Sequence, residues 1–174
     1  MKHLHAVFTN LLLTLALAWA TGCGDRGAPT EGATIAGGKP TPIEESLTRW
    51  RAGDSAGAIQ RFLEIDWKQS PVVFTPGSPL SLREKDLPKM SATAQERLMG
   101  DVLAQLKDLK QLATAVREKG TAAGAKDPEL ARRCFAKLDE CGAALDQPEA
   151  MKILQLTAQA IRKMSVAAAA QPAR

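Results

Sequence analysis

Residues 93–119 read TAQERLMGDVLAQLKDLKQLATAVREK and are the strongest indication of the fold class. Apolar residues recur every three or four positions, and charged residues fill the rest, which is the pattern of an amphipathic helix. The apolar stripe consists of Leu98, Val102, Leu106, Leu109, Ala113 and Val116, widened by Met99, Leu103 and Leu112. Thr93 and Glu96 form a capping-box pattern at the start, and Gly120 follows the last residue. The stretch therefore predicts one long helix that ends before Gly120.

Other segments share this period and predict an all-α domain over residues 43–166. Short helices are expected over 43–50 and 55–67, with Gly53 and Asp54 as the turn and N-cap between them. A longer helix should start at Asp127-Pro128-Glu129 and reach Leu145, and a last one should start at residues 147–149 and run to about Val166. We expect an irregular antiparallel helical bundle, with residues 167–174 as a frayed tail.

Residues 69–80 differ from the helical segments, because Pro71, Pro76, Gly77 and Pro79 are incompatible with a helix while the stretch 72–74 (VVF) is strongly apolar. Two interpretations stay open: a proline-rich strap packed across the bundle, or the rim of a binding groove. Residues 81–84 (SLRE) have capping-box form and predict a short helix that stops at Pro88.

The N-terminal residues 1–22 have the form of a signal peptide, with Lys2 followed by an apolar stretch over residues 7–20. Residues 20–23 (ATGC) close this segment and resemble the lipobox of bacterial lipoproteins, with Ala20 where leucine is usual. The resemblance implies that Cys23 is lipidated and becomes the mature N-terminus. An ordinary secretory signal cleaved near Ala20 or Gly22, or an uncleaved anchor, is the alternative.

Residues 23–42 contain the cysteine and then many glycines and prolines, so we expect a flexible tether between lipid and domain. In the lipoprotein pattern an aspartate directly after the cysteine is associated with the inner membrane. Here Gly24 follows Cys23 and Asp25 comes second, which favours an exported protein on the periplasmic face of the outer membrane. The lipid bilayer is then a partner through acylated Cys23.

Residues 53–71 resemble part of a tetratricopeptide repeat, with Gly53-Asp54, Ala58, Phe62 and Pro71 at matching places. There is no second copy at a period of 34, so a single helical hairpin in an irregular bundle is the alternative. The resemblance implies a peptide or protein groove lined by the helix over residues 55–67, with the strap at its edge. The candidate partner-binding residues are Trp50, Phe62, Trp67 and Phe74.

Composition argues against most catalytic chemistry. His3 and His5 are the only histidines, and both lie in the signal segment. Triads, Cys–His dyads and His-ligated metal sites all need an imidazole, so no metal or other cofactor is expected. Cys134 and Cys141 are seven residues apart, about 10.5 Å along a helix, which exceeds the roughly 7 Å that a disulfide spans. We expect them to be free and buried.

No spacing singles out a catalytic carboxylate pair among Glu44, Glu45, Asp54, Asp101, Asp139 and Glu140. Basic residues on the last two helices are expected to form a solvated face or to contact lipid headgroups; they are Arg132, Arg133, Lys137, Lys152, Arg162 and Lys163. Basic residues do not alternate with aromatic ones, so no nucleic acid is expected as a partner. The sequence therefore favours a membrane-anchored envelope lipoprotein that acts as a protein- or peptide-binding scaffold and is not an enzyme. The alternatives are a small-ligand or lipid carrier, or an enzyme with an unrecognised carboxylate site.

Overall fold

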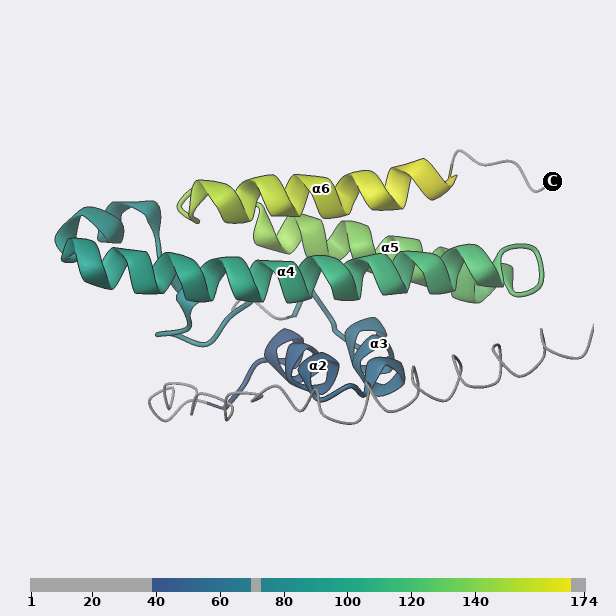
Figure 1. The fold of residues 1–174 in the computed structure, drawn as a ribbon. Coiled ribbons are helices and arrows are strands. Elements are labelled where there is room, and N and C mark those ends of the chain that lie inside the picture. Colours follow the sequence, from purple (N-terminus) through teal and green to yellow (C-terminus); the bar gives the residue numbers. More distant parts are fainter. Residues whose placement is uncertain (1–38, 70–72, 170–174) are drawn as a thin grey trace, which may run out of the picture. The chain divides into compact units, whose positions relative to one another are not determined.

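The structure is a computed structural model that describes residues 39–69 and 73–169 (Figure 1). The signal segment, Cys23, Pro71 and the tail from residue 170 lie outside the described residues, so the predictions made for them are untested. The elements are α2 (Pro42–Arg51), α3 (Ser55–Leu63), the 3-10 helices η1 (Pro79–Ser81) and η2 (Glu84–Lys89), α4 (Ala92–Ala123), α5 (Pro128–Leu145) and α6 (Lys152–Ala169). The described part contains no β-strand, which confirms the all-α fold class.

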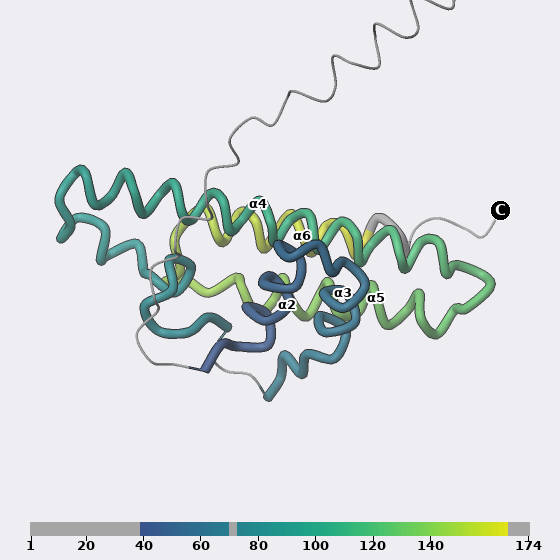
Figure 2. Tube along the Cα trace, turned by 60° about the horizontal axis from the view of Figure 1, so that its bottom comes forward, coloured from purple at the N-terminus to yellow at the C-terminus, as the bar shows by residue number. Residues whose placement is uncertain are grey.

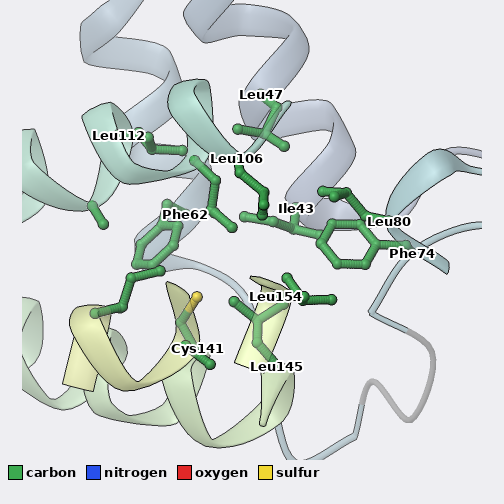
Figure 3. Packing of buried hydrophobic residues seen from close by; sticks show 14 of the residues in the cluster. Ile43, Leu47, Phe62, Phe74, Leu80, Leu106, Leu112, Cys141, Leu145 and Leu154 are labelled. Carbon is green, nitrogen blue, oxygen red and sulfur yellow. The ribbon is translucent and has the colours of Figure 1, made fainter. Parts of the chain in front are cut away.

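The three long helices form the body of the domain. α5 runs antiparallel to α4 and α6, and each of the three contacts the other two (Figures 1 and 2). α2 and α3 form a hairpin that packs on α4, on the side away from α6. One continuous cluster of buried apolar side chains joins the hairpin, the strap and the long helices (Figure 3).

Local capping sets most helix starts. The side chain of Asp54 accepts a hydrogen bond from the amide of Gly57 (2.8 Å), and that of Asp127 accepts one from the amide of Leu130 (3.0 Å). Both caps agree with the sequence prediction. α2 has a full capping box at Thr41, so Pro42 is its first residue rather than the last residue of the tether.

The long helix α4 extends further at both ends than its sequence predicts. Its N-cap is Ser91, not Thr93, and the Gln95 side chain donates to the carbonyl oxygens of Leu87 (2.7 Å) and Met90 (3.1 Å), which joins η2 to the helix. Gly120 lies inside the helix, and the chain leaves helical geometry only at Gly124, where φ is 42°. The predicted end before Gly120 is therefore wrong.

Three other boundaries also differ from the prediction. α3 ends at Leu63 rather than at Trp67. The residue before η2 is Arg83, whose side chain makes no capping hydrogen bond. Ser81, the predicted cap, donates its hydroxyl proton to the carbonyl oxygen of Ser78 instead (2.7 Å). η2 then continues through Pro88, so the predicted capping box and the predicted stop are both wrong.

The last helix begins at Lys152, three residues later than predicted. Residues 147–150 form a turn, and Ala150 makes an isolated antiparallel bridge with Arg83. The amide of Lys152, in the first turn of α6, donates a hydrogen bond to the carboxylate of Glu84 (2.9 Å). Glu84 precedes α4 and is 68 residues before Lys152 in the sequence. α6 is thus capped by a carboxylate that is distant in the sequence, whereas α5 is capped by the aspartate directly before it.

Candidate functional site

The aromatic residues singled out from the sequence serve mainly as core. Phe62 is fully buried, and its ring meets that of Trp67 edge to face with centroids 5.7 Å apart. Phe74 is also buried, whereas Trp50 is half-buried and its indole N–H donates to the side-chain oxygen of Gln111 (3.5 Å). Figure 3 shows Phe62 between Leu112 of α4 and Cys141 of α5. Phe62 and Trp67 therefore belong to the core of the domain, and the groove along residues 55–67 stays a prediction.

A concave surface lies elsewhere, between the strap and the corner that joins α5 to α6. We call it the strap cleft. Its volume is about 520 Å³. The lining residues come from residues 73–83 on one side and residues 144–154 on the other. The strap therefore forms one wall of a cleft and also packs into the core.

The strap cleft has an apolar floor and a polar rim. Phe74 and Leu80 of the strap and Leu145 and Leu154 of the helices contribute apolar surface to its lining and are themselves nearly buried (Figure 3). At the rim the guanidinium of Arg83 lies 3.9 Å from the carboxylate of Glu149. An apolar floor with a few polar groups at its edge is the usual composition of a binding site.

Turn geometry fixes the strap wall. Gly77 has φ of 90°, a conformation that disfavours any residue with a Cβ. The amide of Ser78 donates to the carbonyl oxygen of Thr75, and the amide of Ser81 donates to that of Ser78, each at 2.9 Å. Arg83 is then held to the opposite wall by its bridge with Ala150. Both walls are thus joined at the rim, which keeps the cleft preformed.

Glu44 fastens the strap to the first helix. Its carboxylate accepts hydrogen bonds from the amide (3.0 Å) and hydroxyl (2.5 Å) of Thr75 and from the amide of Thr41 (2.9 Å). The hydroxyl of Thr41 lies 2.8 Å from the carbonyl oxygen of Val73 and donates to it. Partial burial raises the pKa of Glu44, but the hydrogen bonds from Thr75 and Thr41 together outweigh burial and bring the pKa below its ordinary value. Glu44 is therefore a structural anion that holds the strap.

The other carboxylates considered for catalysis are held in structural contacts. Glu45 pairs with Arg61 (2.7 Å), Glu140 with Lys137 (2.7 Å) and Asp139 with Arg162 (3.3 Å), while Asp54 caps α3. Asp101 is exposed on α4. These six residues are spread over three helices and the α2–α3 turn and do not converge on the strap cleft.

Most basic residues expected to form a face on the last two helices make hydrogen bonds or ion pairs within the domain. Arg133 donates to the carbonyl oxygen of Leu63 (3.2 Å) and Lys137 to that of Ile65 (2.8 Å), so both cations neutralise the C-terminal end of α3. Arg132 pairs with Glu129 one turn away. Sequence reasoning missed this role, since the helix end that the two cations cover is about 70 residues away.

The two thiols of the domain are free and fully buried. Burial raises the pKa of both Cys134 and Cys141, so both are protonated at neutral pH and are poor nucleophiles. Among residues 39–69 and 73–169, no group of three or more His, Cys, Asp or Glu side chains is arranged to hold a metal ion. No helix in the same residues is long and apolar enough to cross a membrane.

The chain matches no protein family, no curated protein and no solved structure with which it was compared.

Proposed function

We propose that this chain is a lipid-anchored envelope protein whose helical domain binds a short apolar peptide segment of a partner protein in the strap cleft. The observation that carries the proposal is the cleft itself, with its apolar floor and preformed walls. Its volume of about 520 Å³ lies within the range of sites that hold ligands. The anchor is proposed from residues 20–23 and the tether that follows them.

A peptide fits the strap cleft better than a charged metabolite does. The one basic residue of the lining, Arg83, is already opposed by Glu149, so the rim has no uncompensated charge for an anionic ligand. The floor consists of leucine and phenylalanine side chains, which favour apolar groups. A small apolar ligand or lipid chain is the second candidate, because the same floor favours it.

The test of the cleft uses the mature chain carrying Cys23→Ser, which keeps the protein in solution. A random peptide library is selected on it, and the affinities of selected peptides are measured by fluorescence anisotropy. Ala144→Leu places extra volume in the cleft, whereas Ala143→Leu adds the same volume at an exposed neighbouring position outside it. We expect Ala144→Leu to weaken peptide binding about tenfold, a loss of about 1.4 kcal/mol, and Ala143→Leu to leave it nearly unchanged.

Equal effects of the two alanine substitutions would contradict a site in the strap cleft. Selection of no peptide, together with a thermal shift by fatty acids that Ala144→Leu abolishes, would favour the carrier function instead. The anchor has its own test. Mass spectrometry of the mature N-terminus should show a diacylglyceryl group on Cys23, and Cys23→Ser should release the protein from membranes.

A further inference from the structure

The outer sides of α4 and α6 combine exposed leucines with lysines. We define the outer stripes as Leu103, Lys107 and Lys110 on α4 and Leu156 and Lys163 on α6. Within each helix these residues follow one another at three-, four- or seven-residue spacing, so they share one side of that helix. Leu103 and Leu156 are 52% and 54% exposed, which is unusual in a domain that buries its other leucines wholly or partly.

The outer stripes point away from the core. Lys107 is nine residues, or two and a half turns, from both Leu98 and Val116, which are buried, so it lies on the opposite side of α4. Leu156 lies between Leu154 and Ala158, which are buried two positions away on either side of it. α4 and α6 run parallel and contact one another (Figures 1 and 2), so the two outer stripes follow neighbouring helices.

Within the part of the chain that the structure describes, the lysines of the outer stripes have no acidic partner. In the described residues none of Lys107, Lys110 and Lys163 forms an ion pair, whereas the exposed cations Arg132 and Arg162 both do. α6 contains no acidic residue at all.

In the described residues no acidic side chain of α4 forms an ion pair with Lys107 or Lys110. Glu96 and Glu118 lie toward the two ends of the helix, outside the stretch from Leu103 to Lys110. Asp101 and Asp108 are seven residues apart on another side of the helix, where Asp108 pairs with Arg51 of α2 (2.6 Å).

We propose that the outer stripes of α4 and α6 dock the domain onto an anionic lipid bilayer. Lysines with long apolar stems beside exposed leucines match a surface that is negative at the headgroups and apolar below them. The inference rests on the proposed anchor, because lipidation at Cys23 would keep the domain close to the membrane. Close to the membrane a weak docking surface is effective, since binding becomes intramolecular.

The test measures binding of the unlipidated full mature chain, with Cys23→Ser, to vesicles by flotation. Vesicles contain phosphatidylcholine alone or phosphatidylcholine mixed with phosphatidylglycerol. We expect binding only to the anionic vesicles, with loss at high salt. Each lysine near an anionic surface strengthens binding about fivefold, so Lys107→Gln with Lys163→Gln should weaken it roughly 20-fold.

A matched control removes the same charge elsewhere. Lys68 and Lys126 are exposed and lie outside α4 and α6, so Lys68→Gln with Lys126→Gln should weaken binding far less. Leu103→Ser with Leu156→Ser should also weaken binding while circular dichroism shows unchanged helicity, because both side chains are exposed. Absence of binding to anionic vesicles, or equal losses in the two lysine pairs, would overturn the proposal.

Analytical sedimentation tests whether the outer stripes bind a second copy of the chain rather than a bilayer. A dimer of the unlipidated chain that the leucine pair dissociates would assign the outer stripes to a second copy and overturn bilayer docking. Peptide binding at the strap cleft is measured without lipid and should be unaffected by the lysine pair. The proposals for the cleft, for the anchor at Cys23 and for the docking surface can therefore be refuted independently of one another.

Discussion

Two glycines of α4 should respond in opposite directions to the same substitution. At Gly100, apart from its chain neighbours and the backbone of its own helix turn, no atom lies within 4 Å of the place where a Cβ would be added. A Cβ at Gly120 would lie 2.8 Å from the Cβ of Cys134 and 3.0 Å from the ring of Phe135, both on α5. The first of these contacts is with an atom fixed to the α5 backbone, so it cannot be relieved by a rotamer change alone.

The magnitudes follow from helix propensity and overpacking. Replacing an interior helical glycine by alanine stabilises a protein by roughly 0.5–1 kcal/mol, which is the expected effect of Gly100→Ala. Gly120→Ala gains the same amount but forces α4 and α5 apart, and overpacking of this kind costs about 1–3 kcal/mol. The net expectation for Gly120→Ala is therefore a loss of up to about 2.5 kcal/mol, in place of the gain expected for Gly100→Ala.

The assay is urea unfolding of the unlipidated chain, followed by far-ultraviolet circular dichroism, with unchanged slopes as evidence that only stability has changed. Gly124→Ala serves as a third variant, because the φ of 42° at Gly124 is disfavoured for alanine and should destabilise the end of α4. If Gly120→Ala stabilises the protein as much as Gly100→Ala does, the close approach of α4 and α5 at this position is refuted.

Three more predictions follow from the same contacts. Glu44→Gln should cost roughly 1.5–3 kcal/mol at neutral pH because the charged acceptor of the strap is lost. Since the folded pKa of Glu44 is lowered, the stability difference between wild type and Glu44→Gln should be constant well above the ordinary value of 4.5 and shrink as pH falls through the folded pKa; a difference that grows in acid would contradict the assignment. Cys134 and Cys141 should react with thiol reagents only as fast as the domain opens, and rapid labelling of the folded protein would show that the α4–α5 interface is loose. Trp67 should be quenched by acrylamide much less than Trp50, measured in the two single tryptophan-to-phenylalanine variants, and the reverse order would place the hairpin elsewhere.

Sequence reasoning succeeded where the determinant is local. The apolar period of residues 93–119 identified the core side of α4, and the caps at Asp54 and Asp127 were readable because cap and amide are three residues apart. Cys134 and Cys141 were placed correctly in the core for the same reason. In each case the partner that decides the structure lies within one or two helical turns.

The incorrect predictions concern positions where a residue distant in the sequence decides the structure. Gly120 had the form of a helix end, yet it continues α4 because Cys134 and Phe135 on a later helix need the space that a side chain would occupy. Pro148 had the form of a helix start, yet α6 begins at Lys152, where Glu84 supplies the cap from a distant loop. The spacing of residues along the chain gives no indication of either contact.

The strap cleft was hard to predict for the same reason. Phe74 suggested a groove edge, but the opposite wall is the α5–α6 corner, which reads in sequence as an ordinary helix start. The burial of the candidate aromatic residues Phe62 and Trp67 could not be predicted from the sequence, because it depends on the long helices that pack over the hairpin. A large aromatic side chain on an amphipathic helix is compatible with either role until its neighbours are known.

Glu44 connects these observations, because one carboxylate completes the capping box of α2 and also holds the strap wall of the cleft. The carbonyl oxygen of Lys39, the first residue that the structure describes, lies 3.4 Å from the hydroxyl oxygen of Thr75, whose proton is donated to Glu44 (2.5 Å). The junction between Lys39 and the strap therefore lies beside one wall of the strap cleft. A substitution at this junction that loosens the capping box should change the width of the strap cleft even though it touches no residue of the cleft floor.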